Sequence, residues 1–208
     1  MAEFKLLSDK LSKDFVLDFV YNTLSLEGNV ITKEEVSKVM SGEEVSEKSK
    51  QLITNSLNGL NFILNLLEEN VPLDENKLKD LHEVIMNGIS LGGLYRNVDI
   101  SIKGSNHTPP SYLKVYDRMK KYFDSLLDST MDIWEKIAFS HLQLAKIHPF
   151  LDGNGRLARL VLNYELLLNG FKPVIIYKDK KNEYFDLLEE FKVNKNINPF
   201  IDFLKSQQ

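Results

Sequence analysis

Apolar residues recur at helical spacing along most of the chain. Between Ile53 and Leu67 they are separated by alternate steps of four and three residues, which predicts a long amphipathic helix ending before Pro72. A similar stripe begins at Leu11, and Gly28 is the glycine expected just after the end of that helix. The same period predicts helices over about 75–87, 111–127, 132–147 and 157–168, followed by two helices near the C-terminus.

Local signals mark where several of these helices begin and end. Thr32, with Glu35 three residues later, is the pattern of a capping box. Asp74 can cap the helix that follows it. Pro149 disfavours a helical conformation at His148, so the preceding helix is expected to end there.

One segment departs from the helical pattern. Val98, Ile100 and Ile102 alternate with polar residues, which is the period of a half-exposed strand. The sequence Lys-Gly-Ser-Asn at 103–106 is typical of a turn, and two prolines follow at 109–110. We therefore expect a single small β-hairpin inserted into an otherwise helical protein.

Composition narrows the class of protein. With 208 residues, 43% hydrophobic and 27% charged, the chain is expected to form one all-α domain, with 1–32 as an N-terminal segment and 33–208 as one compact unit. The net charge of −4 argues against nucleic-acid binding. The absence of cysteine excludes a disulfide scaffold, a thiolate metal site and a cysteine nucleophile. The sequence has neither a membrane-spanning apolar run nor a signal peptide, so a cytoplasmic location without membrane attachment is expected.

The stretch from His148 to Arg159, His-Pro-Phe-Leu-Asp-Gly-Asn-Gly-Arg-Leu-Ala-Arg, carries the strongest chemical signal. Gly153 and Gly155 leave backbone N–H groups uncovered just before a helix N-terminus, where unpaired amides and the helix dipole favour an anion. Arg156 and Arg159 lie three residues apart near the start of that helix, where positive charge opposes the dipole. We therefore expect a compensating anion, and a nucleotide polyphosphate fits this arrangement.

Two further side chains complete this prediction. Asp152 lies beside the expected anion pocket and can hold a hard divalent cation such as Mg²⁺, together with water and phosphate oxygens. His148 is a candidate general base for a hydroxyl group. A calcium loop beginning at Asp152 is excluded, because its sixth position would be Leu157 in place of glycine. His141 falls on the apolar side of its helix and is expected to be a core histidine.

These residues together resemble the signature of the Fic domain family, His-Pro-Phe-x-Asp/Glu-Gly-Asn-Gly-Arg-x-x-Arg, with every fixed position occupied. The similarity covers about residues 75–205. The fold it implies is a single Fic-type helical domain. Outside the signature, the similar segments are Gly93–Arg96 and His107–Pro110, which resemble the flap of that family, and Asn182–Phe185 and Pro199–Phe200 in its C-terminal part.

The resemblance implies transfer of AMP from ATP to a Ser, Thr or Tyr hydroxyl of a protein target, with release of pyrophosphate. It implies that His148 is the base, that Asp152 holds Mg²⁺ between the α- and β-phosphates, and that the flap pairs with the target backbone. Phosphoryl-type transfer needs mainly positioning and charge stabilisation. In the implied site, Gly153, Asn154 and Gly155 cradle the phosphates, Arg156 and Arg159 bind the outer phosphates, Phe150 anchors the loop, and Val98, Ile100 and Ile102 dock the target.

A second motif lies far upstream. The segment from Thr23 to Asn29, with Glu27 followed by Gly28, resembles the inhibitory motif Ser/Thr-x-x-x-Glu-Gly/Asn of many Fic proteins. Glu27 is a carboxylate in the last turn of a predicted helix, where the dipole disfavours negative charge. Pairing of Glu27 with Arg159 would satisfy both charges, keep Arg159 from the γ-phosphate and hold ATP in a non-productive pose. The sequence therefore predicts an autoinhibited enzyme.

Other interpretations stay open from the sequence. A Fic-fold kinase would have lysine in place of the second signature glycine, which Gly155 disfavours, whereas uridylyl or phosphocholine transfer is compatible with the loop. Removal of AMP from a modified target is a second alternative, with Glu27 positioning water. A third is a non-catalytic interaction module that has kept the nucleotide pocket, against which His148 and Asp152 argue. Self-modification and assembly into a homo-oligomer are both compatible with the chain.

Overall fold

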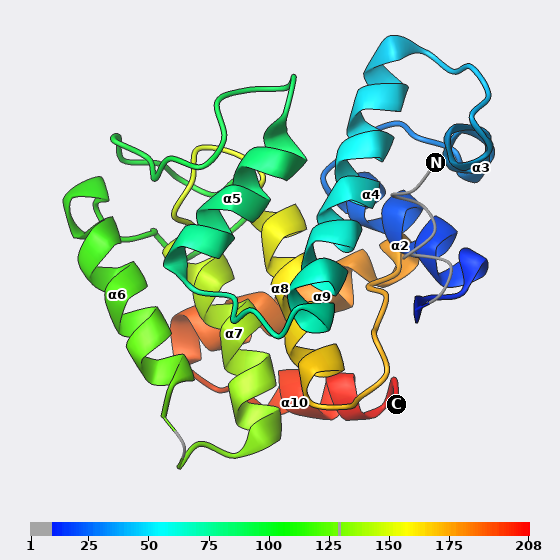
Figure 1. The fold of residues 1–208 in the computed structure, drawn as a ribbon. Coiled ribbons are helices and arrows are strands. Elements are labelled where there is room, and N and C mark those ends of the chain that lie inside the picture. Colours follow the sequence, from blue (N-terminus) through cyan, green and yellow to red (C-terminus); the bar gives the residue numbers. More distant parts are fainter. Residues whose placement is uncertain (1–9, 129) are drawn as a thin grey trace. The chain divides into compact units, whose positions relative to one another are not determined.

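The computed structural model describes residues 10–128 and 130–208, and within them every regular element is helical (Figure 1). The predicted all-α fold class is therefore confirmed. The elements fall into two compact units. One comprises the chain up to Gly93 with Ile175–Lys181, and the other comprises Leu94–Val174 and Asn182–Gln208. Of the helices described, none is both long and apolar enough to cross a membrane.

In the first unit, α4 packs against α2, α3 and α5, and a returning 3₁₀ turn, η2, packs against α2. The predicted capping box is present, because Thr32 and Glu35 exchange hydrogen bonds at the start of α3. Asp74 caps α5, also as predicted. The elements are α2 (Lys13–Leu26), α3 (Lys33–Ser41), α4 (Glu47–Glu68), α5 (Glu75–Met86) and η2 (Lys178–Lys180).

A left-handed glycine closes the C-terminus of α2, as predicted. Gly28 has a φ of +84°, and its N–H donates to the carbonyl of Ser25 at 3.0 Å. The N–H of Asn29 donates to the carbonyl of Leu24 at 3.2 Å. This pair of bonds is the Schellman arrangement, which satisfies the last carbonyl groups of a helix. Glu27 is consequently the C-cap residue of α2, and it is exposed.

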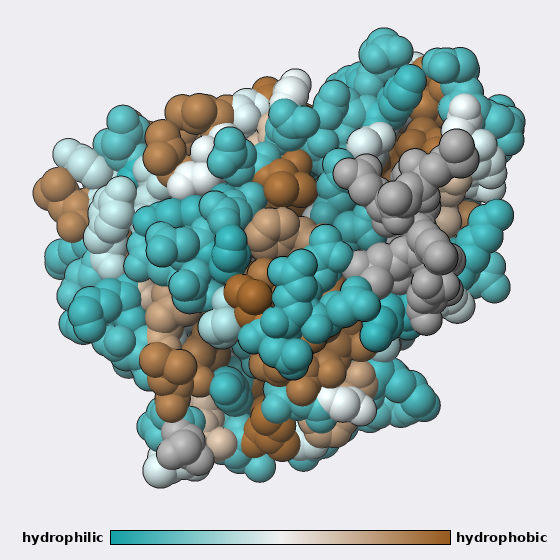
Figure 2. All heavy atoms as spheres, in the orientation of Figure 1, coloured by the Kyte–Doolittle hydropathy of each residue, from teal (hydrophilic) through white to brown (hydrophobic). Residues whose placement is uncertain are grey.

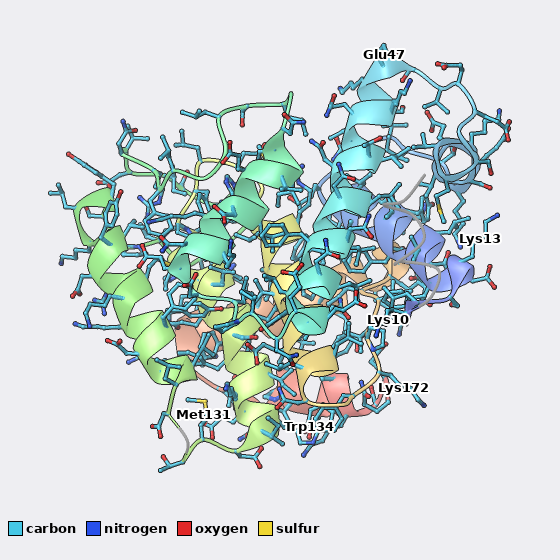
Figure 3. All side chains as sticks on the ribbon, viewed as in Figure 1. Lys10, Lys13, Glu47, Met131, Trp134 and Lys172 are labelled. Carbon is cyan, nitrogen blue, oxygen red and sulfur yellow. The ribbon has the colours of Figure 1, made fainter. Side chains whose placement is uncertain are left out.

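In the second unit, α7 packs against α6, α8 and α10. Trp134, labelled in Figure 3, lies at the start of α7 with its ring 4.3 Å from that of Phe171, and the ammonium of Lys205 lies 5.8 Å from the Trp134 ring. The outward face of α6 is hydrophilic in Figure 2. The elements are η1 (Tyr112–Lys114), α6 (Val115–Leu126), α7 (Ile133–Ile147), α8 (Asn154–Leu168), α9 (Lys181–Glu189), the π-helix η3 (Glu190–Asn194) and α10 (Asn198–Lys205).

His141 of α7 is a core histidine, as predicted. It is 0% exposed, with Nδ1 2.9 Å from the carbonyl oxygen of Ala158 and Nε2 2.9 Å from the hydroxyl oxygen of Tyr184. A carbonyl oxygen only accepts, so Nδ1 carries the proton and Nε2 accepts from Tyr184. Burial lowers the pKa of His141 to about 4. His141 therefore joins α7, α8 and α9 as a neutral group.

The β-hairpin expected around 98–106 is wrong, because none of these residues forms a strand. Side chains take the backbone bonds that a partner strand would supply. The guanidinium of Arg96 donates to the carbonyl of Val98 at 2.9 Å, and the carboxylate of Glu189 accepts from the N–H of Asn106 at 2.8 Å. The three residues expected to dock a target therefore lie on a loop without a strand: Val98 is exposed, and Ile100 and Ile102 are half-buried.

Arg96 fixes this loop and the end of α7 at once. Its side chain is 0% exposed and donates from Nε to the carbonyl of His148 at 3.0 Å, and from Nη2 to the carbonyl of Pro110. With the bond to Val98, one guanidinium serves three backbone carbonyls. The N–H of Arg96 also donates to the carbonyl of Pro149 at 2.8 Å. Burial lowers the pKa of Arg96, but arginine keeps its charge in proteins.

We expect Arg96→Leu to destabilise the protein by about 3 kcal/mol, because three partly buried carbonyls lose their donor, at about 1 kcal/mol each. Urea unfolding followed by circular dichroism measures this change. Lys120→Leu, at an exposed lysine of α6, is the control for loss of one positive charge. An equal, small loss of stability in both variants would show that Arg96 does not hold the loop.

His141 predicts a pH dependence of stability. Its folded pKa of about 4 lies below the ordinary value of 6.5, so the unfolded chain binds the proton first on acidification. This contribution is fully present above about pH 6.5 and is lost as the pH falls towards 4, by on the order of 3 kcal/mol. We expect His141→Gln to lose this part of the dependence. Unfolding free energies of both proteins between pH 7 and pH 4.5 measure it, and parallel curves would contradict it.

Candidate functional site

The predicted signature forms a tight loop between α7 and α8. The predicted end of the helix at His148 is confirmed: this residue is the C-cap of α7, with a left-handed backbone (φ +52°). A positive φ is uncommon for a residue that has a β-carbon. Here Pro149 disfavours helix on one side, and Arg96 binds the carbonyl of His148 on the other. α8 begins at Asn154, three residues before the predicted Leu157.

The side chain of Asn154 joins the start of α8 to the backbone of the loop at Phe150. Its Oδ1 accepts from the N–H of Phe150 at 3.0 Å, and its Nδ2 donates to the carbonyl of Phe150 at 2.9 Å. Phe150 is fully buried, with its ring 5.2 Å from that of Tyr95. The resemblance assigned the Asn154 side chain to a phosphate. In the structure, its amide oxygen and its amide nitrogen both form hydrogen bonds within the loop. This asparagine sets the shape of the loop.

The N-terminus of α8 suits an anion. Its N-cap is Gly153, with φ +77°, a residue that has no side chain to cap the first turn. The first N–H groups of any helix lack intrahelical acceptors, and the dipole makes this end positive. One expectation needs correction, because the N–H of Gly153 is engaged by Oδ1 of Asp152 at 2.6 Å. Gly155, one residue into α8, is half-buried.

Two buried guanidinium groups lie at this end of α8. Arg156 is 6% exposed and Arg159 is 3% exposed, and their spacing places them on one helix face. Nη2 of Arg156 lies 3.6 Å from Oδ2 of Asp152, whose side chain is 63% exposed. Two cations at a positive helix end, next to one exposed carboxylate, are an arrangement that suits a polyphosphate with a divalent cation.

The acidic groups suit a metal that is shared with a ligand. In residues 10–128 and 130–208, no cluster of three or more His, Cys, Asp or Glu could hold an ion by itself. Mg²⁺ commonly uses one or two carboxylates, with water and phosphate oxygens filling the other positions. The exposed carboxylate of Asp152 beside the α8 N-terminus fits that mode.

Other predicted site residues lie elsewhere. Glu27 belongs to the first unit and Arg159 to the second, so their pairing stays a prediction. Thr23, at the start of the upstream motif, is buried in the first unit. Sequence reasoning missed the role of Arg96, whose only signal was its place in the Gly93–Arg96 segment.

Comparisons with known proteins agree with this geometry. Residues 72–166 match the Fic/DOC family. The protein adenylyltransferase Fic of Nematostella vectensis is 29% identical over 204 residues, covering 92% of this chain and 47% of that protein. The protein adenylyltransferase Fic of Drosophila yakuba is 26% identical over 206 residues, which cover 94% of this chain and 41% of that protein. The chain thus spans about half the length of the curated relatives it matches.

Solved structures of other proteins have a similar fold. A Fic domain containing signaling protein from Bacteroides thetaiotaomicron has a TM-score of 0.82 at 25% identity, covering 99% of this chain and 85% of that one. Residues 134–508 of Fic-1 from C. elegans have a TM-score of 0.83 at 25% identity, covering 98% of this chain and 62% of that one. Residues 72–166 therefore match the Fic/DOC family in sequence, and the chain resembles solved Fic domain proteins in fold.

Proposed function

We propose that the protein is an adenylyltransferase that moves AMP from ATP to a Ser, Thr or Tyr hydroxyl of a protein target. One observation carries the proposal: His148, fixed in a left-handed conformation at the end of α7, lies one short loop before a helix N-terminus with two buried arginines. The names of the relatives from Nematostella and Drosophila support the same activity.

In this proposal, His148 removes the proton from the target hydroxyl, and the hydroxyl oxygen attacks the α-phosphorus of ATP. The bond from the α-phosphorus to the oxygen bridging to the β-phosphate breaks. Pyrophosphate leaves with the electron pair, and the target keeps AMP as a phosphate ester. Arg96 acts as a positioning residue, because its Nε holds the carbonyl of His148 at 3.0 Å.

The start of α8 would hold the phosphates. The N–H groups of its first turn and the side chains of Arg156 and Arg159 would bind the β- and γ-phosphates, which would align the α-phosphate with the attacking oxygen. Asp152 would hold Mg²⁺, which would neutralise charge on the phosphates when bound. These residues would recognise the phosphate groups without contacting the nucleotide base. The preference for adenine over other bases therefore has to be measured separately.

Regulation by Glu27 is the finer part of the proposal. Glu27 is the exposed C-cap of α2, at the negative end of that helix dipole, and Arg159 is a buried cation at the positive end of α8. Each charge would be stabilised by the other. A guanidinium paired with Glu27 would be withheld from the γ-phosphate, which supports autoinhibition.

Intact-mass analysis after incubation with Mg²⁺ and each nucleoside triphosphate in turn tests the reaction type. A mass gain of AMP from ATP, on the protein itself or on a protein in an added lysate, is the expected result. A gain of one phosphate would indicate a kinase, and a gain of UMP another transferase. Binding of ATP with no gain on any protein would indicate a non-catalytic module.

We expect His148→Ala to lower AMP transfer about 10²–10⁴-fold, the usual contribution of a general base. ATP binding and the unfolding free energy should change little, because the variant keeps the backbone bonds of this residue to Arg96 and Leu144. Labelling with radioactive ATP gives the rate, and calorimetry gives the affinity. Transfer at the wild-type rate would exclude His148 as the base.

We expect Asp152→Asn to abolish both AMP transfer and its stimulation by Mg²⁺, because the neutral amide is a poor ligand for a hard cation. The amide oxygen can still accept the N–H of Gly153, so the loop should keep its shape. A Mg²⁺ titration of the transfer rate measures the effect. Asp124→Asn, at an exposed aspartate of α6, is the matched control and should behave like the wild type.

We expect Glu27→Gly to raise AMP transfer, including self-modification, about tenfold or more, by removing a charge-assisted interaction with Arg159 worth about 1.5–3 kcal/mol. Any removal of AMP from modified targets should be lost. Arg159→Ala should not copy the activation, because it also discards a phosphate ligand. Glu69→Gly changes the C-cap of α4 in the same unit and is the matched control. Equal labelling of the wild type and Glu27→Gly would show that Glu27 is no brake.

A further inference from the structure

A second concave site lies within the second unit. A cavity of about 550 Å³ is lined by the return arm of the loop at 107–110, by α6, by the end of α7 and by residues 191 and 195. Its volume falls in the range of small-molecule sites, about 300–1,000 Å³. Ile147 lines it but no residue of 148–159 does, so the start of α8 is not part of its lining.

Three cationic side chains line this cavity from three elements: Arg118 on α6, Lys146 on α7 and Lys195 just after η3. No carboxylate is among its described lining residues, and none of the three cations has a carboxylate partner among the described residues. Burial and the neighbouring charge of Lys195 lower the pKa of Lys146. Unlike the chain as a whole, with its net charge of −4, this cavity concentrates uncompensated positive charge.

Nearby ionisable groups do not offset these cations. Glu189 of α9 already accepts from the N–H of Asn106 at 2.8 Å and lies 3.4 Å from Nζ of Lys192. His107, which lines the cavity, has Nε2 3.0 Å from the carbonyl oxygen of Lys146, so Nε2 carries the proton. Burial lowers the pKa of His107, which keeps it neutral at pH 7.

The rest of the lining is mixed. Gln143 and Thr108 provide an amide and a hydroxyl, while Phe191 and Ile147 provide apolar surface. The ring of Phe191 lies 5.2 Å from Nζ of Lys146. One carboxylate would neither fill this volume nor balance three cations, whereas a phosphate group carries up to two charges and takes several charge-assisted bonds. We propose that this cavity binds a phosphorylated organic small molecule with at least two negative charges.

Titration by NMR and calorimetry tests the site, with inorganic phosphate, AMP and fructose 1,6-bisphosphate as probes. We expect saturable binding of an organic phosphate that shifts the amide signals of Thr108 and Gln143. The double variant Lys146→Gln/Lys195→Gln should weaken it about tenfold or more, because charge-assisted bonds are lost. Lys195→Gln alone, at an exposed position, should weaken it in the same direction if the double variant folds poorly.

Two controls separate this site from others. Lys120→Gln/Lys121→Gln makes the same charge change on the outer face of α6 and should leave the affinity nearly unchanged. Arg159→Ala alters only the proposed ATP site and should also leave it unchanged. Equal weakening by both lysine pairs, or loss of binding in Arg159→Ala, would overturn the proposal. So would inorganic phosphate binding as tightly as the organic probes, or no probe binding below about 1 mM.

Discussion

A single buried guanidinium group, that of Arg96, joins the loop at 98–110 to the end of α7 in the second unit. Arg96 serves the carbonyls of Val98, Pro110 and His148, so both arms of a loop and the end of α7 share one donor group. Each of these three bonds is partly buried, so their loss would cost more than the loss of exposed hydrogen bonds. The conformation of His148 thus depends on a residue 52 positions earlier in the chain. The position of the proposed base, His148, therefore depends both on α7 and on the loop that contains Arg96.

Much of the fold could be predicted because its signals are local. Helical periodicity gave α4, the Thr32–Glu35 pattern gave the start of α3, and Gly28 gave the end of α2. Each depends on contacts within a few residues. The hairpin prediction failed because alternation reports only an extended chain with two unlike faces. The alternation does not indicate which groups form hydrogen bonds with the backbone. Here the side chains of Arg96 and Glu189 do so.

The same division applies to the candidate site. The residues of the signature are adjacent in sequence, so their place around the α8 N-terminus followed from glycine and helix-end chemistry. The internal use of the Asn154 side chain did not, because an asparagine at a helix start can face a ligand or the backbone with equal ease. The cavity next to α7 had no sequence signal, since Arg118, Lys146 and Lys195 meet only through the fold.

The loop has two features that cost stability. His148 has a left-handed backbone despite its β-carbon, at a cost of about 1–3 kcal/mol. The α8 N-cap is a glycine, although a Ser or Asp cap would typically add stability. A loop selected for stability alone would avoid both features. They occur at the proposed base and at the helix end proposed to bind phosphate, and backbone strain such as that of His148 is commonly kept at functional sites. The position of these features in the loop therefore supports the proposed chemistry.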